Sequence, residues 1–303
     1  VVTYEFENVD YDAASYIEQQ GKLPQGAEAL AITQHRARER ELLETLKLPT
    51  APFKIVETAE ECEEAFQSVS IPAVVKTCRG GYDGKGQLKV DTKEDIAEAM
   101  AFVQEAYPCI VEEWIPFDKE ISVVFTRGIN GDITFFPLAE NVHVHHILHT
   151  TIAPAQVNDS IKNRAIHAAE RIAEEMNIVG TFAIEMFVVG EEMYINEMAP
   201  RPHNSGHYTI EACNISQFNQ HIRGICGLPL IPVKQYEHAC MVNVLGEHMD
   251  RALDTLAKDD GSFVHLYGKA EAKSKRKMGH ITWLGKDIQH MREKAIPFEE
   301  DVR

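Results

Sequence analysis

The chain has 303 residues, a length that predicts one large domain or two to three modest ones. Hydrophobic residues make up 44% of it and charged residues 25%, the composition of an ordinary globular protein. The formal net charge of −17 argues against binding to nucleic acid or to anionic membrane surfaces, because both would be repelled. Small anionic ligands feel only the local field, so they are not excluded.

The six cysteines are scattered, with no C-x-x-C pair and no Cys/His spacing that suits zinc. Several lie in apolar runs, which predicts reduced, buried thiols in a cytoplasmic protein. No stretch of sequence is long and apolar enough to cross a membrane, so we expect no membrane partner.

The first predicted elements form a small α+β block. Residues 1–7 read as a strand already under way, and Thr33 is predicted to cap a helix that runs to about Leu46. Prolines at 49 and 52 then mark a boundary. Between about 50 and 112 we expect strands at 54–56, 73–76, 87–90 and 109–111. Capping signals at Thr58 and Thr92 open two helices in this block.

Longer elements are expected beyond residue 112. Strands are predicted at 120–126, 133–137 and 148–153, followed by a helix at 160–176. Two strands, 181–189 and 193–198, flank a turn, and a helix at about 215–226 and three weaker strands follow. This alternation predicts a mixed α and β fold.

A glycine-rich loop at 79–87 lies between two predicted strands. Four glycines in positions 80–86 allow the backbone to fold closely over phosphates and offer N–H donors, and Lys85 adds a positive charge. The pattern is not a Walker A loop, and an ordinary flexible hairpin would have the same glycines. Lys76, on the apolar strand before the loop, favours phosphate binding because a buried lysine needs an anionic partner.

Two carboxylates are predicted to face each other across a hairpin. Glu185 and Glu197 are twelve residues apart, and a three-residue turn at 190–192 would place them opposite one another. Directly opposed carboxylates repel unless a cation lies between them, and hard oxygen ligands suit Mg²⁺. Strand alternation points Asn196 to the other face unless a bulge brings it round. A solvated acidic strand face is the alternative, and the flanking Phe, Ile and Met residues argue against it.

Three weaker patterns accompany these sites. The loop from Arg201 to His207 is dense in donors that suit an anionic substrate. The segment 112–115 ends a strand and would present backbone edges to an adenine ring, although a plain interdomain strand fits it equally well. Histidines at 143, 145 and 146 suggest zinc, yet no fourth ligand is evident, so we favour histidines that face solvent or substrate.

Taken together and in this order, these motifs resemble those of ATP-grasp enzymes. The combination G-G-Y-D-G-K-G-Q at 80–87 with N-E-M-A-P-R-P-H-N-S-G-H at 196–207 is similar to N5-carboxyaminoimidazole ribonucleotide synthetases in particular. T-Y-E-F-E-N at 3–8 and R-K-M-G-H at 276–280 match the same family. The resemblance covers essentially the whole chain.

The resemblance implies roles for individual residues. Magnesium would be held by Glu185 and Glu197. Bicarbonate and the ribonucleotide would face Tyr82, Asp83, Arg201, His203, Asn204, Lys269 and Arg276, and the aminoimidazole would meet Glu5 or Glu7. ATP would contact Arg36, Lys76, Gly81, Tyr82, Asp83, Gly84, Lys85, Gly86, Gln87, Glu112, Glu113, Trp114, Ile115, Glu120, His143, Asn196 and Glu197.

The resemblance also implies an ATP-grasp fold with a small lid at 49–112 and a larger C-terminal domain with an extension at 113–303. Residues 1–48 would be a remnant of the N-terminal domain and a linker helix. Family members open with a Gly-rich Rossmann-like segment that is largely absent here, so we expect residues to be missing upstream. A homodimer is implied as well.

The reaction implied is the carboxylation of 5-aminoimidazole ribonucleotide. Bicarbonate would attack the γ-phosphate of ATP to give carboxyphosphate and ADP, and the exocyclic amine would take the carboxyl unit. Three rival interpretations are another ATP-grasp ligase, such as the formate-using glycinamide ribonucleotide transformylase, a non-catalytic nucleotide-binding module, and a nucleic-acid binder using the basic run at 269–277. The N-S-G-H segment argues against the first of these. The intact charges at 76, 185 and 197 argue against the second, and the net charge argues against the third.

Overall fold

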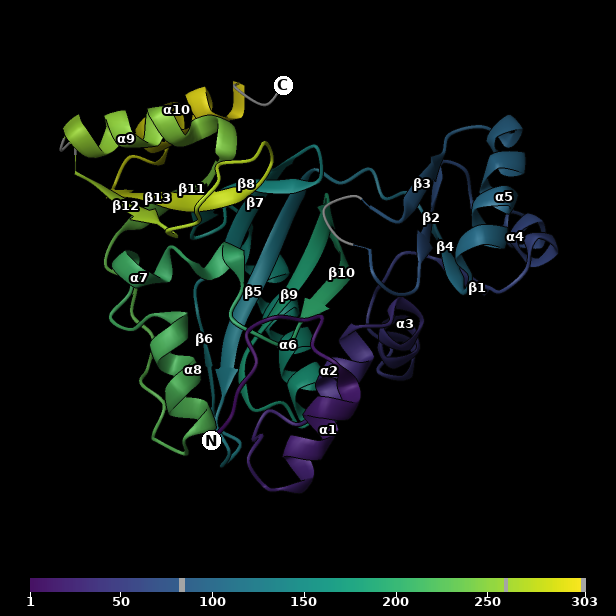
Figure 1. Cartoon of the computed structure of the whole chain (residues 1–303), viewed down its shortest axis with the longest axis horizontal. Coiled ribbons are helices and arrows are strands. Elements are labelled where there is room, and N and C mark those ends of the chain that lie inside the picture. The colour runs from purple at the N-terminus through teal and green to yellow at the C-terminus, as the bar shows by residue number, and fades with distance from the viewer. Residues whose placement is uncertain (82–84, 259–260, 301–303) are drawn as a thin grey trace.

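The computed structural model of the chain describes residues 1–81, 85–258 and 261–300, and contains two β-sheets. Figure 1 shows the small sheet set to one side of the large one, with the N-terminal helices beside both. Among the described residues, no helix has the length and apolarity that crossing a bilayer requires.

The N-terminal segment differs from its prediction. Residues 1–7 form no strand, and the Val2 N–H instead donates to the Lys22 carbonyl at 2.7 Å while Tyr4 packs against Leu23. Three helices follow: α1 (Tyr11–Gln19), α2 (Glu28–Thr33) and α3 (Arg36–Thr45).

The predicted helix from Thr33 to Leu46 is also wrong at its start. The Thr33 hydroxyl donates to the Ala29 carbonyl at 2.9 Å, so it closes the last turn of α2 instead of capping the next helix. Because a threonine can bond either to the turn before it or to the turn after it, its presence alone does not fix a helix boundary.

The small sheet has the strand order β1-β4-β2-β3, and all of its pairs are antiparallel. Helices α4 (Ala59–Ala65) and α5 (Ile96–Ala106) cover one face and share a core with the sheet that includes Val56, Val75 and Val103. Thr58 caps α4 as predicted, whereas Thr92 caps a short 3-10 turn (Lys93–Asp95) that leads into α5. The strands are β1 (Phe53–Val56), β2 (Ala73–Thr77), β3 (Gln87–Val90) and β4 (Cys109–Glu113).

The large sheet is antiparallel throughout and has the order β10-β9-β5-β7-β8-β11-β13-β12, with β6 paired to β5. Its first strands are β5 (Lys119–Arg127), β6 (Ile133–Phe135), β7 (Ala139–Val144) and β8 (Ile147–Ala153). The others are β9 (Gly180–Val189), β10 (Glu192–Ala199), β11 (His238–Leu245), β12 (Ser262–Leu266) and β13 (Lys277–Gly285).

Helices cover the large sheet at both ends. The helix α6 (Asp159–Glu175) buries an alanine-rich face against β5 and β9, and α8 (Gln217–Ile225) follows the short α7 (Thr209–Ala212). Helices α9 (Met249–Lys258) and α10 (Ile288–Glu300) pack on β11 and β13, as Figure 1 shows at the C-terminal end. Neither α9 nor α10 was predicted. Pro297 lies inside α10, and a proline reads as a helix breaker in a sequence.

Candidate active site

The paired glutamates face each other through a β-bulge. Strands β9 and β10 are joined by only two residues, not the predicted three, and they pair Ile195 with Met186. The register then shifts at Asn196, so that Glu197 lies opposite Glu185 as predicted. In a bulge two residues oppose one on the partner strand, and the extra residue here is Asn196, so Glu197 comes opposite Glu185.

The carboxylate of Glu185 is in an environment that disfavours its charge. The residue is 7% exposed, and burial followed by the neighbouring Glu197 raises the pKa of Glu185 to about 8. The closest base is His203, whose Nε2 lies 3.7 Å from Glu185 Oε1, but burial holds the pKa of His203 well below its ordinary value. The neutral imidazole of His203 therefore supplies no positive charge to the Glu185 carboxylate.

A third carboxylate and a histidine adjoin this pair. Glu120 on β5, His143 on β7 and Glu185 on β9 have ligand atoms within 4.8 Å of one another, and His143 Nδ1 lies 2.6 Å from Glu120 Oε2. Burial lowers the pKa of His143, but the hydrogen bond that it donates to Glu120 and the charge of Glu185 outweigh burial and raise the pKa to about 8. His145 and His146 lie in the β7–β8 turn instead, so His143 is the histidine of the three that joins the carboxylates.

Arg36 connects the carboxylates with the glycine-rich loop. Its Nη1 lies 3.7 Å from Glu197 Oε2, and its backbone N–H donates to the Cys78 carbonyl at 2.9 Å. The described ends of the loop are tight, since a Cβ on Gly81 would lie 2.9 Å from the Lys85 carbonyl oxygen. Tyr82, Asp83 and Gly84, which the sequence assigns to the site, lie outside the described residues.

Lys76 has an anionic partner within the protein. Its Nζ lies 2.7 Å from Glu112 Oε2, and Glu112 Oε1 accepts from Arg40 Nε at 2.6 Å. Arg40, which is 1% exposed, also donates to the Asn196 carbonyl. Burial alone would raise the pKa of Glu112, but the two cations hold it well below its usual range.

Arg40 is a residue that the sequence interpretation missed. Its position in α3 could have indicated its role, because Glu39 and Arg40 interrupt a buried helix face that also includes Ala37 and Leu43. Charged residues on the buried face of a helix need partners and so indicate a site. Glu39 is likewise buried, and burial raises its pKa to about 8.

The segment that follows Glu112 leads from the small sheet to the large one. Glu113 and Trp114 donate backbone N–H bonds to the carbonyls of Pro52 and Pro72, respectively, and Lys89 Nζ lies 4.6 Å from the centre of the Trp114 ring. Ile115 is buried next to them. Gln87 is paired with Lys76 in the β2–β3 ladder, which brings the loop end and this segment to one sheet.

The loop that includes Arg201, His203 and Asn204 runs beside the carboxylates. Arg201 pairs with Glu7, so one of the two N-terminal glutamates named by the sequence reaches this loop. A buried chain of hydrogen bonds supports the loop from behind, running from Thr151 to Asn141, Ser122 and Ser205, and Ser205 contacts His203 Nδ1 at 2.8 Å. Ser205 belongs to the predicted loop, but Thr151, Asn141 and Ser122 were not predicted, because each comes from a different strand.

The basic run extends from the end of β12 to the start of β13. Lys269 donates to the Lys277 carbonyl at 2.6 Å, and Arg276 to the Glu271 carbonyl at 3.0 Å, both in exposed positions. The charge of Lys277 contributes to the lowered pKa of both His203 and His207, and the ring of Tyr267, just before the run, lies 6.5 Å from that of His207. The sequence interpretation included Lys277 in the run but gave it no role.

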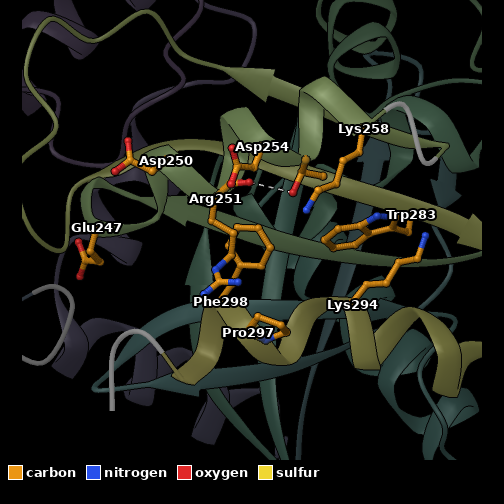
Figure 2. A pocket seen from close by; sticks show the side chains of 10 residues that line it. Glu247, Asp250, Arg251, Asp254, Lys258, Trp283, Lys294, Pro297 and Phe298 are labelled. Atoms are coloured by element: carbon orange, nitrogen blue, oxygen red, sulfur yellow. Dashed lines mark hydrogen bonds between the residues drawn. The ribbon is translucent and has the colours of Figure 1, made fainter.

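A separate hollow of about 450 Å³ lies between α9 and α10, and Figure 2 shows it from close by. None of its lining residues is among the predicted site residues. They are Glu247, Asp250, Arg251, Asp254, Thr255, Lys258, Trp283, Lys294, Pro297 and Phe298.

Comparisons with known proteins agree with this geometry. Residues 41–218 match the ATP-grasp domain, and residues 239–294 match the phosphoribosylaminoimidazole carboxylase C-terminal domain. The N5-carboxyaminoimidazole ribonucleotide synthase of Bacillus subtilis is 44% identical over 285 residues, which are 94% of this chain and 75% of that protein.

Solved structures give the same result. The N5-carboxyaminoimidazole synthetase of Staphylococcus aureus complexed with ADP superposes with a TM-score of 0.92 and 36% identity, covering 98% of this chain and 79% of that one. The Aspergillus clavatus enzyme in complex with ADP and 5-aminoimidazole ribonucleotide gives 0.89 and 29%, covering 100% and 81%. The chain therefore belongs to the N5-carboxyaminoimidazole ribonucleotide synthase family of ATP-grasp ligases.

Proposed function

We propose that this chain uses ATP and bicarbonate to carboxylate 5-aminoimidazole ribonucleotide to N5-carboxyaminoimidazole ribonucleotide, with ADP and phosphate as the other products. The observation that carries the proposal is the bulge-aligned pair of buried Glu185 and half-exposed Glu197 beside Arg36 and the glycine-rich loop. Family membership and the ligands named for related structures support the choice of substrates.

Magnesium is the ion that fits the carboxylates best. The donor set consists of carboxylate oxygens, with Glu120 close to Glu185, and the raised pKa of Glu185 indicates that a cation is needed to hold it ionised. Glu185 and Glu197 would hold the ion, which when bound would neutralise charge on the ATP phosphates.

ATP would lie between the two sheets. Lys76 and the backbone of the 81–87 loop would bind phosphates, with Tyr82, Asp83, Gly84 and Lys85 completing the loop, and the segment 112–115 would border the adenine. Because Glu112 already neutralises one of its two buried cations, the triad of Lys76, Glu112 and Arg40 has one positive charge left to offer a phosphate.

The reaction would proceed in two steps. A bicarbonate oxygen attacks the γ-phosphorus, the bond to the β,γ-bridging oxygen breaks, and carboxyphosphate and ADP form. The exocyclic amine of the ribonucleotide then attacks the carboxyl carbon, loses a proton and expels phosphate. Arg201, His203, Asn204, Lys269 and Arg276 would orient these reactants, and the glycine-rich loop would exclude water from the hydrolysable intermediate.

We also propose a division of the chain into domains and an assembly state. The lid would comprise residues 49–112 and the larger domain residues 113–303, with 1–48 belonging to an N-terminal domain. A homodimer in the cytoplasm is expected from the resemblance, and sedimentation equilibrium of the purified chain measures its assembly state directly.

ADP formation tests the proposed function. We expect ADP release to require both 5-aminoimidazole ribonucleotide and bicarbonate, and to stop when either is left out. Release that depends on formate and glycinamide ribonucleotide instead would move the chain to another ATP-grasp reaction. ADP formation that is indifferent to both substrates would refute the carboxylation.

A further inference from the structure

The carboxamide of Gln217, at the start of α8, pairs with the backbone of His203. The His203 N–H donates to Gln217 Oε1 at 2.9 Å, and Gln217 Nε2 donates to the His203 carbonyl at 2.7 Å. A backbone N–H can only donate and a carbonyl can only accept, so this pair of hydrogen bonds fixes which atom of the Gln217 amide is oxygen and which is nitrogen.

The second hydrogen of the same amide determines the state of His207. Gln217 Nε2 lies 3.1 Å from His207 Nδ1, and because an amide nitrogen only donates, Nδ1 must accept and carries no proton. Burial is the main cause that lowers the pKa of His207 to about 4, so the ring is neutral near pH 7. Its proton is then on Nε2.

The backbone around this contact is tightly packed. The Gln217 N–H donates to Thr209 Oγ1 at 3.0 Å, and that hydroxyl donates to the Gly206 carbonyl at 2.6 Å. A Cβ on Gly206 would lie 2.5 Å from Gln217 Oε1, so the loop touches the amide directly. Gln217 is fully buried and holds the loop from the side of α8.

We propose that Gln217 is a positioning residue for the carboxylation, which holds the 203–207 loop in place and keeps His207 as a neutral Nε2–H donor. The His207 ring lies 5.0 Å from that of His280 and 6.5 Å from that of Tyr267, two residues before Lys269. The ring of His207 therefore lies near the segment that contains Lys269, one of the proposed ribonucleotide residues. This inference rests on the proposed function for its substrate and on the amide geometry for its chemistry.

The substitution Gln217→Glu tests the proposal with little change of shape. A carboxylate loses both N–H donors and favours a proton on His207 Nδ1. In ¹⁵N-histidine NMR of the metal-free chain, His207 should show the Nε2–H tautomer in the parent and a protonated Nδ1 in the variant. A His207→Gln variant assigns the signal. The KM for 5-aminoimidazole ribonucleotide should rise about tenfold or more, while the ATP affinity changes less than about twofold.

Gln220 offers a matched control on the same helix. It is equally buried, bonds the backbone N–H and carbonyl of Ile231 and donates to Thr134 Oγ1, but does not contact the loop. Gln220→Glu should lower the melting temperature to a similar extent, and the His207 tautomer and the ribonucleotide KM should stay at their parent values. Equal effects of the two variants on KM would show that only general stability is involved, and would overturn the proposal.

The parent protein alone also decides the question if Gln217→Glu does not fold. A His207 signal protonated at Nδ1, or at both nitrogens, in the parent at pH 7 would overturn the inference. The NMR measurement needs no substrate, so its outcome is independent of whether the chain carboxylates 5-aminoimidazole ribonucleotide. Absence of that activity in the parent would instead refute the proposed function.

Discussion

At the scale of single residues, the site places charges where they are unfavourable without a ligand. Glu185 and Glu197 are opposed across the bulge. The buried His203 beside Glu185 is neutral, and the cations nearby are His143, which pairs with Glu120, and Arg36, which lies 3.7 Å from Glu197. By contrast, Glu112 is compensated by two cations. In the proposed function the first group binds a cation, and the second stabilises the protein and offers one positive charge to a phosphate.

Replacing Glu185 with Gln should therefore have opposite effects on activity and stability. The folded-state pKa of Glu185 is about 8 against an ordinary 4.5, so the folded protein binds this proton more firmly than the unfolded chain. Stability falls as pH rises through that window, and Gln removes the loss. We expect the metal-free variant to be more stable than the parent at pH 8.5 by on the order of 1–2 kcal/mol, with no Mg²⁺-dependent turnover.

Melting curves from pH 5 to pH 9 in a chelator measure this effect. Glu140→Gln is the control, because Glu140 is also buried but accepts from Lys119 at 2.9 Å, and its loss should destabilise the protein. A Glu185→Gln curve parallel to that of the parent, together with normal turnover, would remove the metal assignment. Glu39 retains a raised pKa in both proteins, so the melting temperature of each is expected to keep some dependence on pH.

The triad of Lys76, Glu112 and Arg40 predicts unequal effects for its members. Glu112→Gln leaves two buried cations without a counter-charge and should destabilise the protein by about 3–5 kcal/mol. Lys76→Ala keeps the Arg40–Glu112 pair, so it should cost less stability but weaken ATP binding, and Lys76→Arg should not restore it fully. Urea unfolding and nucleotide titration separate the two effects. Unchanged ATP affinity in Lys76→Ala would make Lys76 a structural residue.

At the scale of elements, the sequence predicted most strands but not every reason for their pairing. Alternating apolar residues located the strands that became β9 and β10, and the facing of Glu185 and Glu197 was predicted correctly. The reason was different, because a shorter turn and a bulge at Asn196 replace the three-residue turn. The bulge shifts the alternation by one position, from buried Met193 and Ile195 to buried Met198. A three-residue turn without a bulge would also bring Glu197 opposite Glu185, so the sequence did not distinguish the two arrangements.

Contacts that join distant elements were the part the sequence could not provide. Arg40, Ser122 and Gln217 come from α3, β5 and α8, and each acts through a partner more than 70 positions away or through a backbone group. Residue type does not reveal such partners, since buried arginines and glutamines look like exposed ones in a sequence. The helix α10 was missed for a different reason, since Pro297 lies inside it and a proline reads as a helix breaker.

The glycine-rich loop predicts a specific sensitivity at Gly86. Its φ is +68°, and an added Cβ would lie 2.7 Å from Thr77 Oγ1, so Gly86→Ala should distort the end of the loop. We expect the KM for ATP to rise about tenfold, corresponding to roughly 1.4 kcal/mol. Gly190→Ala is the control, because Gly190 has a φ of +55° with nothing within 4 Å. Both variants should lose about 1 kcal/mol of stability, and equal ATP kinetics would exclude a role of the loop.

The basic segment between β12 and β13 gives a second element-scale prediction. If Arg276 faces the ribonucleotide, Arg276→Ala should raise the KM for 5-aminoimidazole ribonucleotide about thirtyfold, the loss of a charge-assisted hydrogen bond worth on the order of 2 kcal/mol. Lys273 lies in the same run, pairs with Glu271 in solvent, and should tolerate replacement by Ala. Titration of the substrate at saturating ATP compares them, and small equal effects would identify the run as surface charge.

At the scale of the whole molecule, two sheets from different parts of the chain bring their charged residues to one place. The small sheet provides Lys76, Glu112 and the loop, and the large sheet provides Glu120, Glu185 and Glu197. The overall net charge of −17 says nothing of this local arrangement. Motif order predicted the family and the fold correctly, whereas composition alone would have supported many globular proteins.

The central claim is that ATP activates bicarbonate for transfer to the amine. Turnover with ¹⁸O-labelled bicarbonate tests it most directly, because the attacking bicarbonate oxygen stays with the phosphorus when the carboxyl unit leaves. With 5-aminoimidazole ribonucleotide present, we expect the released phosphate to carry one ¹⁸O and the product to carry the carboxyl carbon of the same bicarbonate. Phosphate without label, formed at the same rate, would show that water attacks ATP and would contradict the account.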